Sequence, residues 1–135
     1  MFISRFLVLC FSLLLLTSCD PEKVIVIKNF GKEPIHLDIL FNDCEKPEAF
    51  SFLEGEHFAN IYLGTDGMNM HIIHMGMGAW SDDEIVTVLD CIESIQVIKE
   101  GDGPYFIEGA PLKALKDASL KTSKGNTIEL VIEDF

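Results

Sequence analysis

Apolar and polar side chains alternate with a period of two residues in several segments of this chain. In residues 35–42, and again in residues 126–133, nearly every second side chain is apolar. Because successive side chains of a β-strand point to opposite faces, this pattern predicts strands with one buried face. The other segments that we predict as strands are residues 24–28, 49–53, 57–63, 84–90 and 95–99.

Turn-forming residues separate these segments and set the expected architecture. Residues 29–34, which include glycine and proline, lie between the first two strands, so a hairpin is expected there. Residues 110–120 depart from the alternation, with leucines separated by lysines and with Pro111 in a position that suits a first helical turn. The sequence therefore predicts a mainly β fold, an antiparallel β-sandwich or barrel of about seven strands with one short helix near residues 111–120.

The charge balance excludes one large class of partners. The 135 residues include 22 aspartates and glutamates against 10 lysines and arginines, a net charge of −12. This field repels phosphate backbones and anionic lipid headgroups, so no nucleic-acid partner is expected. The length suits a single domain.

The first 18 residues have the pattern of a secretory signal. Arg5 precedes an apolar stretch that continues to Leu16 and is interrupted only by Ser12. This stretch of roughly 11 residues is shorter than the ~20 that a membrane-spanning helix needs. It ends in Leu16-Thr17-Ser18-Cys19, which resembles the lipobox of bacterial lipoproteins.

The lipobox resemblance implies a location and a covalent modification. Signal peptidase II would cleave before Cys19, and acyl chains such as palmitate on that residue would hold the protein to a membrane. Residues 1–18 would then be the signal peptide, residues 19–23 the lipidated N-terminus with a short spacer, and residues 24–135 a single β-sandwich domain. The domain is expected in the bacterial cell envelope, outside the cytoplasm, anchored to the inner or the outer membrane.

A second resemblance concerns the mature chain. Residues 24–29 (Val-Ile-Val-Ile-Lys-Asn), followed by residues 35–37 and then by residues 53–56 before another strand, are similar to small β-sandwich lipoproteins of bacterial envelopes. This resemblance implies a fold and carries no functional residues.

Two cysteines remain once the signal and the lipidated residue are set aside. In an oxidising compartment Cys44 and Cys91 predict a disulfide. It would close a loop of 48 residues, counted inclusively, which is worth roughly 4 kcal/mol in the chain-entropy treatment. The alternative is a pair of metal-binding thiolates, which would need a reducing environment or further ligands nearby.

Methionines and histidines are concentrated in residues 68–77. Thioether sulfur and imidazole suit Cu(I) or Ag(I), and the segment resembles Met/His segments of periplasmic copper-handling proteins. The alternatives are a flexible apolar contact surface and ordinary packing. A regular strand would divide the ligands between two faces, whereas a loop could gather them. The candidate ligands are Met68, Met70, His71, His74, Met75 and Met77.

The sequence has no pattern typical of an enzyme. No GxSxG elbow and no GxxxxGK phosphate loop is present, and the adjacent acids of residues 82–84 are typical of a solvated turn. We therefore expect no catalysis and no resident cofactor apart from the soft metal considered above.

Three hypotheses of function follow from these observations. The first is a lipid-anchored binding or scaffolding module that contacts a protein or an envelope component through exposed loops. The second is a periplasmic Cu(I)/Ag(I)-binding protein that uses the Met/His segment. The third is an inhibitor of a cationic enzyme such as lysozyme, because the mature chain would hold nine lysines against 22 acids, a net charge of −13.

Overall fold

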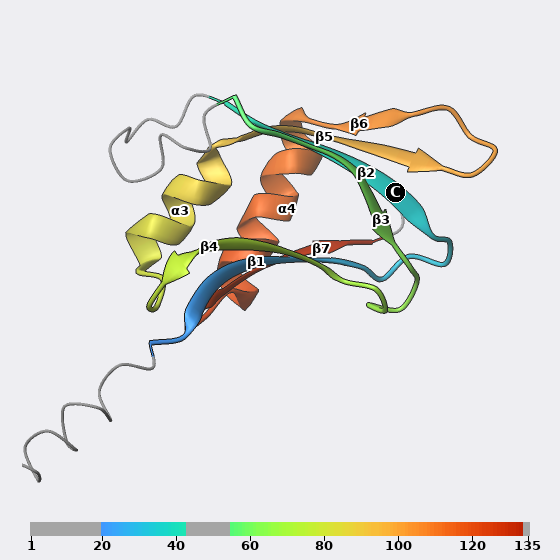
Figure 1. The fold of residues 1–135 in the computed structure, drawn as a ribbon. Coiled ribbons are helices and arrows are strands. Elements are labelled where there is room, and N and C mark those ends of the chain that lie inside the picture. The colour runs from blue at the N-terminus through green and yellow to red at the C-terminus, as the bar shows by residue number, and fades with distance from the viewer. Residues whose placement is uncertain (1–19, 43–54, 134–135) are drawn as a thin grey trace, which may run out of the picture.

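The computed structural model describes residues 20–42 and 55–133, which form two β-sheets and two helices (Figure 1). One sheet has three strands in the order β4-β1-β7, and the other has four in the order β3-β2-β5-β6. The strands are β1 (Glu22–Asn29), β2 (Ile35–Phe41), β3 (His57–Leu63), β4 (His71–Met77), β5 (Ile92–Lys99), β6 (Tyr105–Ile107) and β7 (Thr127–Ile132). The helices are α3 (Asp82–Asp90) and α4 (Gly109–Thr122).

The three-stranded sheet is built around β1, which lies antiparallel to β4 and parallel to β7. The run Ile25-Val26-Ile27 is buried at every position, so both faces of the sheet are covered at the centre of this strand. The hairpin predicted between residues 24–28 and 35–42 is therefore wrong, and the sheet is not purely antiparallel. Buried Asn29 helps the chain to leave this sheet, since its side chain donates to the Glu33 carbonyl and accepts from the Gly31 N–H, both at 2.8 Å.

The four-stranded sheet is antiparallel throughout, with β2 between β3 and β5 and with β6 at the edge. In β2 the alternate residues Ile35, Leu37, Ile39 and Phe41 are all buried, so the alternation predicts this strand correctly. Strand β3 coincides with the predicted residues 57–63. The predicted strand at residues 49–53 lies outside the described residues.

The two helices differ in how well the sequence predicted them. Helix α4 is present and longer than expected, with Pro111 in its first turn. The strand predicted at residues 84–90 is wrong, because this segment is helix α3. A capping box starts that helix: the Ser81 hydroxyl accepts from the Glu84 N–H at 3.2 Å, and the Glu84 carboxylate accepts from the Ser81 N–H at 2.8 Å.

The sheets face each other, and both helices lie at one end of the molecule (Figure 1). The core joins side chains from both sheets and both helices into one cluster. The fold is thus mainly β and sandwich-like, and in the part that the structure describes neither sheet closes into a barrel. No helix there is long and apolar enough to span a membrane. Fully buried core residues include Ile25, Ile27, Leu37, Ile39, Phe41, Leu63, Ile95, Ile128, Leu130 and Ile132.

Cys91, between α3 and β5, is fully buried and its sulfur is part of a disulfide. The other cysteines of the sequence lie outside the described residues. The backbone N–H of Asn42 donates to the Cys91 carbonyl at 2.7 Å, which brings the chain two residues before Cys44 beside Cys91. This contact favours the Cys44–Cys91 pairing, which stays a prediction.

Candidate functional site

The Met/His segment is divided between a turn and a strand. Met68 and Met70 lie in the β3–β4 turn, and His71 begins strand β4 opposite Ile27. Met77 ends that strand opposite Glu22. At about 3.3 Å per residue, His71 and Met77 are roughly 20 Å apart along the strand. The loop that could have gathered all six candidate ligands is therefore absent from the described residues.

Strand β4 also separates its side chains by face. Ile73 is buried, and His71 and Met75 are half-buried, on the face that points to the interior. His74 points outward, where its Nδ1 lies 2.8 Å from the Glu22 carboxylate. Among the described residues there is no group of three or more His, Cys, Asp or Glu side chains that could hold a metal ion. Binding of Cu(I) or Ag(I) stays a prediction, limited to neighbouring members of the set.

His71 and Met75 line a groove of about 400 Å³ between strands β3 and β4. Phe58 and Glu56 form its β3 side. The groove is thus mixed in character, and its lining includes an aromatic ring, a thioether, two imidazoles and one carboxylate.

Two exposed methionines of the segment, Met68 and Met70, lie at one end of the sandwich, beside the β1–β2 turn, whereas Met77, which is 63% exposed, lies at the Glu22 end. The Gly67 N–H donates to the Asn29 carbonyl at 2.8 Å, which joins the β3–β4 turn to the end of β1. The Phe30 ring packs on Gly67 so closely that a β-carbon there would lie 3.0 Å from it. Phe30, Met68 and Met70 are 50%, 65% and 49% exposed. We call these three residues the apolar tip.

The described chain enters the domain at Glu22, the first residue of β1. The apolar tip lies beyond the other end of this strand (Figure 1). The helices lie at the Glu22 end. Exposed Lys32, Glu33 and Asp66 belong to the same two turns as the tip residues. The tip is therefore an apolar surface with charged residues around it, and its net charge is negative.

The end of the molecule that carries Glu22 is held together by a polar cluster. The Lys23 ammonium contacts both oxygens of the Glu84 carboxylate, at 3.0 and 3.1 Å, and lies 5.1 Å from the centre of the Trp80 ring. The indole N–H of buried Trp80 donates to the Val24 carbonyl at 3.3 Å. The Ser81 N–H and the Lys23 ammonium lower the pKa of Glu84.

Two features near the Met/His segment in sequence have structural roles. Trp80, which follows the Met/His segment in sequence, is a packing residue under Lys23. The acids of residues 82–84, expected in a solvated turn, are the first turn of α3. Sequence reasoning missed Phe30, although an aromatic residue in the turn Asn29-Phe30-Gly31 was a visible signal.

No protein-family model matches this chain, and neither the curated proteins nor the solved structures include a match.

Proposed function

We propose that this protein is a lipid-anchored module of the bacterial envelope that binds a protein partner through the apolar tip. The observation that carries the proposal is the exposure of Phe30, Met68 and Met70 together at the end of the sandwich opposite to Glu22. Exposed single apolar residues are common, but three on two turns that contact each other form a surface that a partner can cover.

The position of the tip suits a tethered protein. Strand β1 has eight residues and spans roughly 25 Å, and the lipobox cysteine, Cys19, lies three residues before Glu22 in the sequence. An acyl chain on Cys19 would hold the Glu22 end near the membrane and leave the tip facing away from it. The disulfide at Cys91 supports an oxidising compartment.

The chemistry of the tip suits a protein partner better than a membrane. Methionine side chains adapt their shape to a partner, and an aromatic ring supplies a large contact area. Glu33 and Asp66, on the same turns, would be repelled by anionic headgroups. They would instead attract basic side chains at the border of a partner's apolar pocket, which keeps the inhibitor of a cationic enzyme as one form of this proposal.

Photo-crosslinking in the cell tests the proposal. A photoreactive amino acid replaces Met68 in the full chain, and a control chain carries it at Lys121, which is exposed on α4 at the helical end. We expect a discrete protein adduct from position 68 only, and we expect the substitutions Phe30→Ser and Met70→Ser to abolish it. Equal adducts from both positions, or an adduct that persists in the Phe30→Ser/Met70→Ser chain, would contradict the proposal.

A further inference from the structure

Within residues 20–42 and 55–133, strand β7 lies at the edge of its sheet, and only some of its outward N–H and C=O groups form hydrogen bonds. The Val24 N–H donates to the Asn126 carbonyl and the Phe30 N–H to the Ile132 carbonyl, at 2.9 and 2.8 Å. Because backbone groups alternate in direction along a strand, the even-numbered residues of β7 face β1. Thr127, Glu129 and Val131 therefore direct their N–H and C=O groups away from the sheet.

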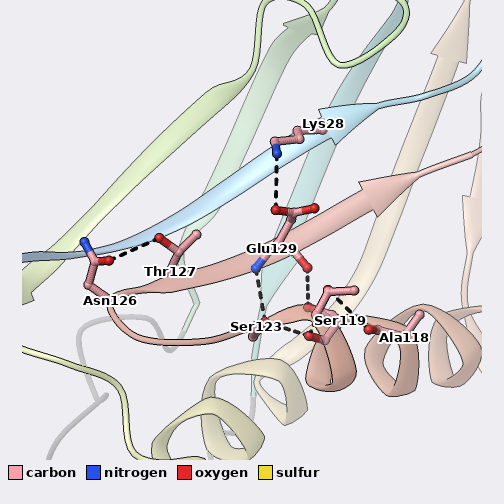
Figure 2. Close-up of polar contacts among 8 residues, drawn as sticks. Lys28, Ala118, Ser119, Ser123, Asn126, Thr127 and Glu129 are labelled. Atoms are coloured by element: carbon pink, nitrogen blue, oxygen red, sulfur yellow. Dashed lines mark hydrogen bonds and ion pairs between the residues drawn. The ribbon is translucent and has the colours of Figure 1, made fainter.

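The C-terminal part of α4 and the residues that follow it close this edge at its first two outward positions, and Figure 2 shows the contacts of the second, Glu129. Thr127 exchanges two backbone hydrogen bonds with Lys124, each 3.1 Å long. The Glu129 N–H donates to the Ser123 hydroxyl at 3.1 Å, and the Glu129 carbonyl accepts from the Ser119 hydroxyl at 2.5 Å. No contact of this kind is made to Val131 by the described residues.

A groove of about 370 Å³ opens beside Val131, between β7 and α4. Exposed Ala114 and Ala118 supply a smooth helical wall. The volume of the groove lies within the range of small-ligand pockets. An unpaired strand edge beside a groove is the geometry in which an extended peptide adds as a further strand.

The charges of the groove select the kind of peptide. Its lining includes two carboxylates, Glu129 and Glu133, and no lysine or arginine. The Glu129 carboxylate contacts Lys28 at 3.2 Å, whereas Glu133, just after β7, forms no ion pair with any of the described residues. A basic side chain of the peptide would complement this surface, and an acidic one would be repelled.

We propose that the groove between α4 and the Val131 edge of β7 binds an extended, basic segment of another protein by strand addition. The backbone of the segment pairs with Val131, its small side chains lie on Ala114 and Ala118, and a lysine or arginine meets Glu133. This surface differs from the apolar tip, so the inference stands on observations of its own.

Two synthetic probes of seven residues test the proposal on the full chain, purified in detergent. One has the sequence Thr-Val-Lys-Val-Lys-Val-Thr, and the other has glutamate in place of both lysines. By fluorescence anisotropy we expect the lysine probe to bind at least tenfold more tightly than the glutamate probe. We also expect the lysine probe to slow hydrogen exchange at Val131.

Two variants and a matched control locate the binding. Ala114→Trp fills the groove with a large side chain. Val131→Pro removes a backbone N–H that points away from β1. Each variant is expected to weaken binding of the lysine probe at least tenfold. Leu120→Trp changes an exposed residue of the same helix outside the groove and should leave binding unchanged. Equal binding of both probes, or unchanged binding in the groove variants, overturns the proposal. A dimer that sedimentation detects in wild type and not in Val131→Pro also overturns it, because a second copy would then be the occupant.

Discussion

Glu84 connects three parts of the chain through one carboxylate. It accepts from the Ser81 N–H at the start of α3 and from the Lys23 ammonium at the start of β1. Lys23 in turn covers the ring of Trp80. The start of the sheet and the start of the helix are thus fixed to each other by residues that lie far apart in the sequence.

The substitution Glu84→Gln should lower the free energy of unfolding by about 1 kcal/mol at pH 7, because it weakens the capping box and removes the ion pair. Asp82→Asn removes the same charge from an exposed position of the same turn and should cost less than half as much. Urea unfolding of the three chains measures the difference.

The pH dependence of that difference follows from the pKa of Glu84, which the folded state lowers. The ionised Glu84 carboxylate stabilises the fold fully above the ordinary pKa of a glutamate, about 4.3. This stabilisation is lost as the pH falls through the lower pKa of the folded state. The stability difference between wild type and Glu84→Gln should therefore begin to shrink as the pH falls below about 4.3 and should vanish below the folded-state pKa of Glu84. A difference that stays constant from pH 7 to pH 3 would show that the carboxylate charge is not the cause.

Ser119 is the buried polar residue that closes the edge of β7. Ser119→Ala should lower the free energy of unfolding by about 1 to 2 kcal/mol, since the Glu129 carbonyl loses its partner. Thr122→Ala is the control, because the hydroxyl of exposed Thr122 bonds only to carbonyls of its own helix. Thermal unfolding that shows equal losses for both variants would contradict this role of Ser119.

Among the elements, the alternation of apolar and polar residues correctly predicted strands that bury one face. The strand around Leu37 and the last strand around Leu130 were predicted because each buries one face. Residues 84–90 were predicted as a further strand of the alternating pattern, although Ser81 and Glu84 have the spacing of a capping box. The capping box, a helix start signal, outweighed the strand propensity of residues 84–90.

Pairing between elements could not be predicted in the same way. The β1–β7 pair joins residues about a hundred positions apart, as in Ile25 opposite Ile128, and no local pattern encodes that partner. The sequence left open whether the candidate ligands of the Met/His segment lie on a strand, which would divide them, or in a loop, which could gather them. The pairing of His71 with Ile27 makes residues 71–77 a strand, and this partner also lies far away in the sequence.

The disulfide at Cys91 links the α3–β5 junction to another part of the chain. If Cys44 is its partner, Cys44→Ala should lower the free energy of unfolding by about 2 to 4 kcal/mol. Reduction should then destabilise wild type and leave Cys44→Ala unaffected. Two free sulfhydryls in the unreduced mature protein would contradict the pairing.

At the scale of the whole molecule, the two ends of the sandwich differ in character. Helices and the Lys23–Glu84 pair lie at the end where β1 begins, and the apolar tip of Phe30, Met68 and Met70 lies at the other (Figure 1). This polarity matches a protein that is tethered at one end and binds at the other. The excess of acids, 22 against 10 basic residues, favours encounter with cationic partners.

Metabolic labelling with palmitate tests the tether, on which the proposed orientation depends. We predict that the label enters the wild-type chain and a Cys10→Ser control, and that Cys19→Ser abolishes labelling and releases the protein from the membrane fraction. Failure of the label to enter wild type, or unchanged processing and fractionation of Cys19→Ser, would contradict the account.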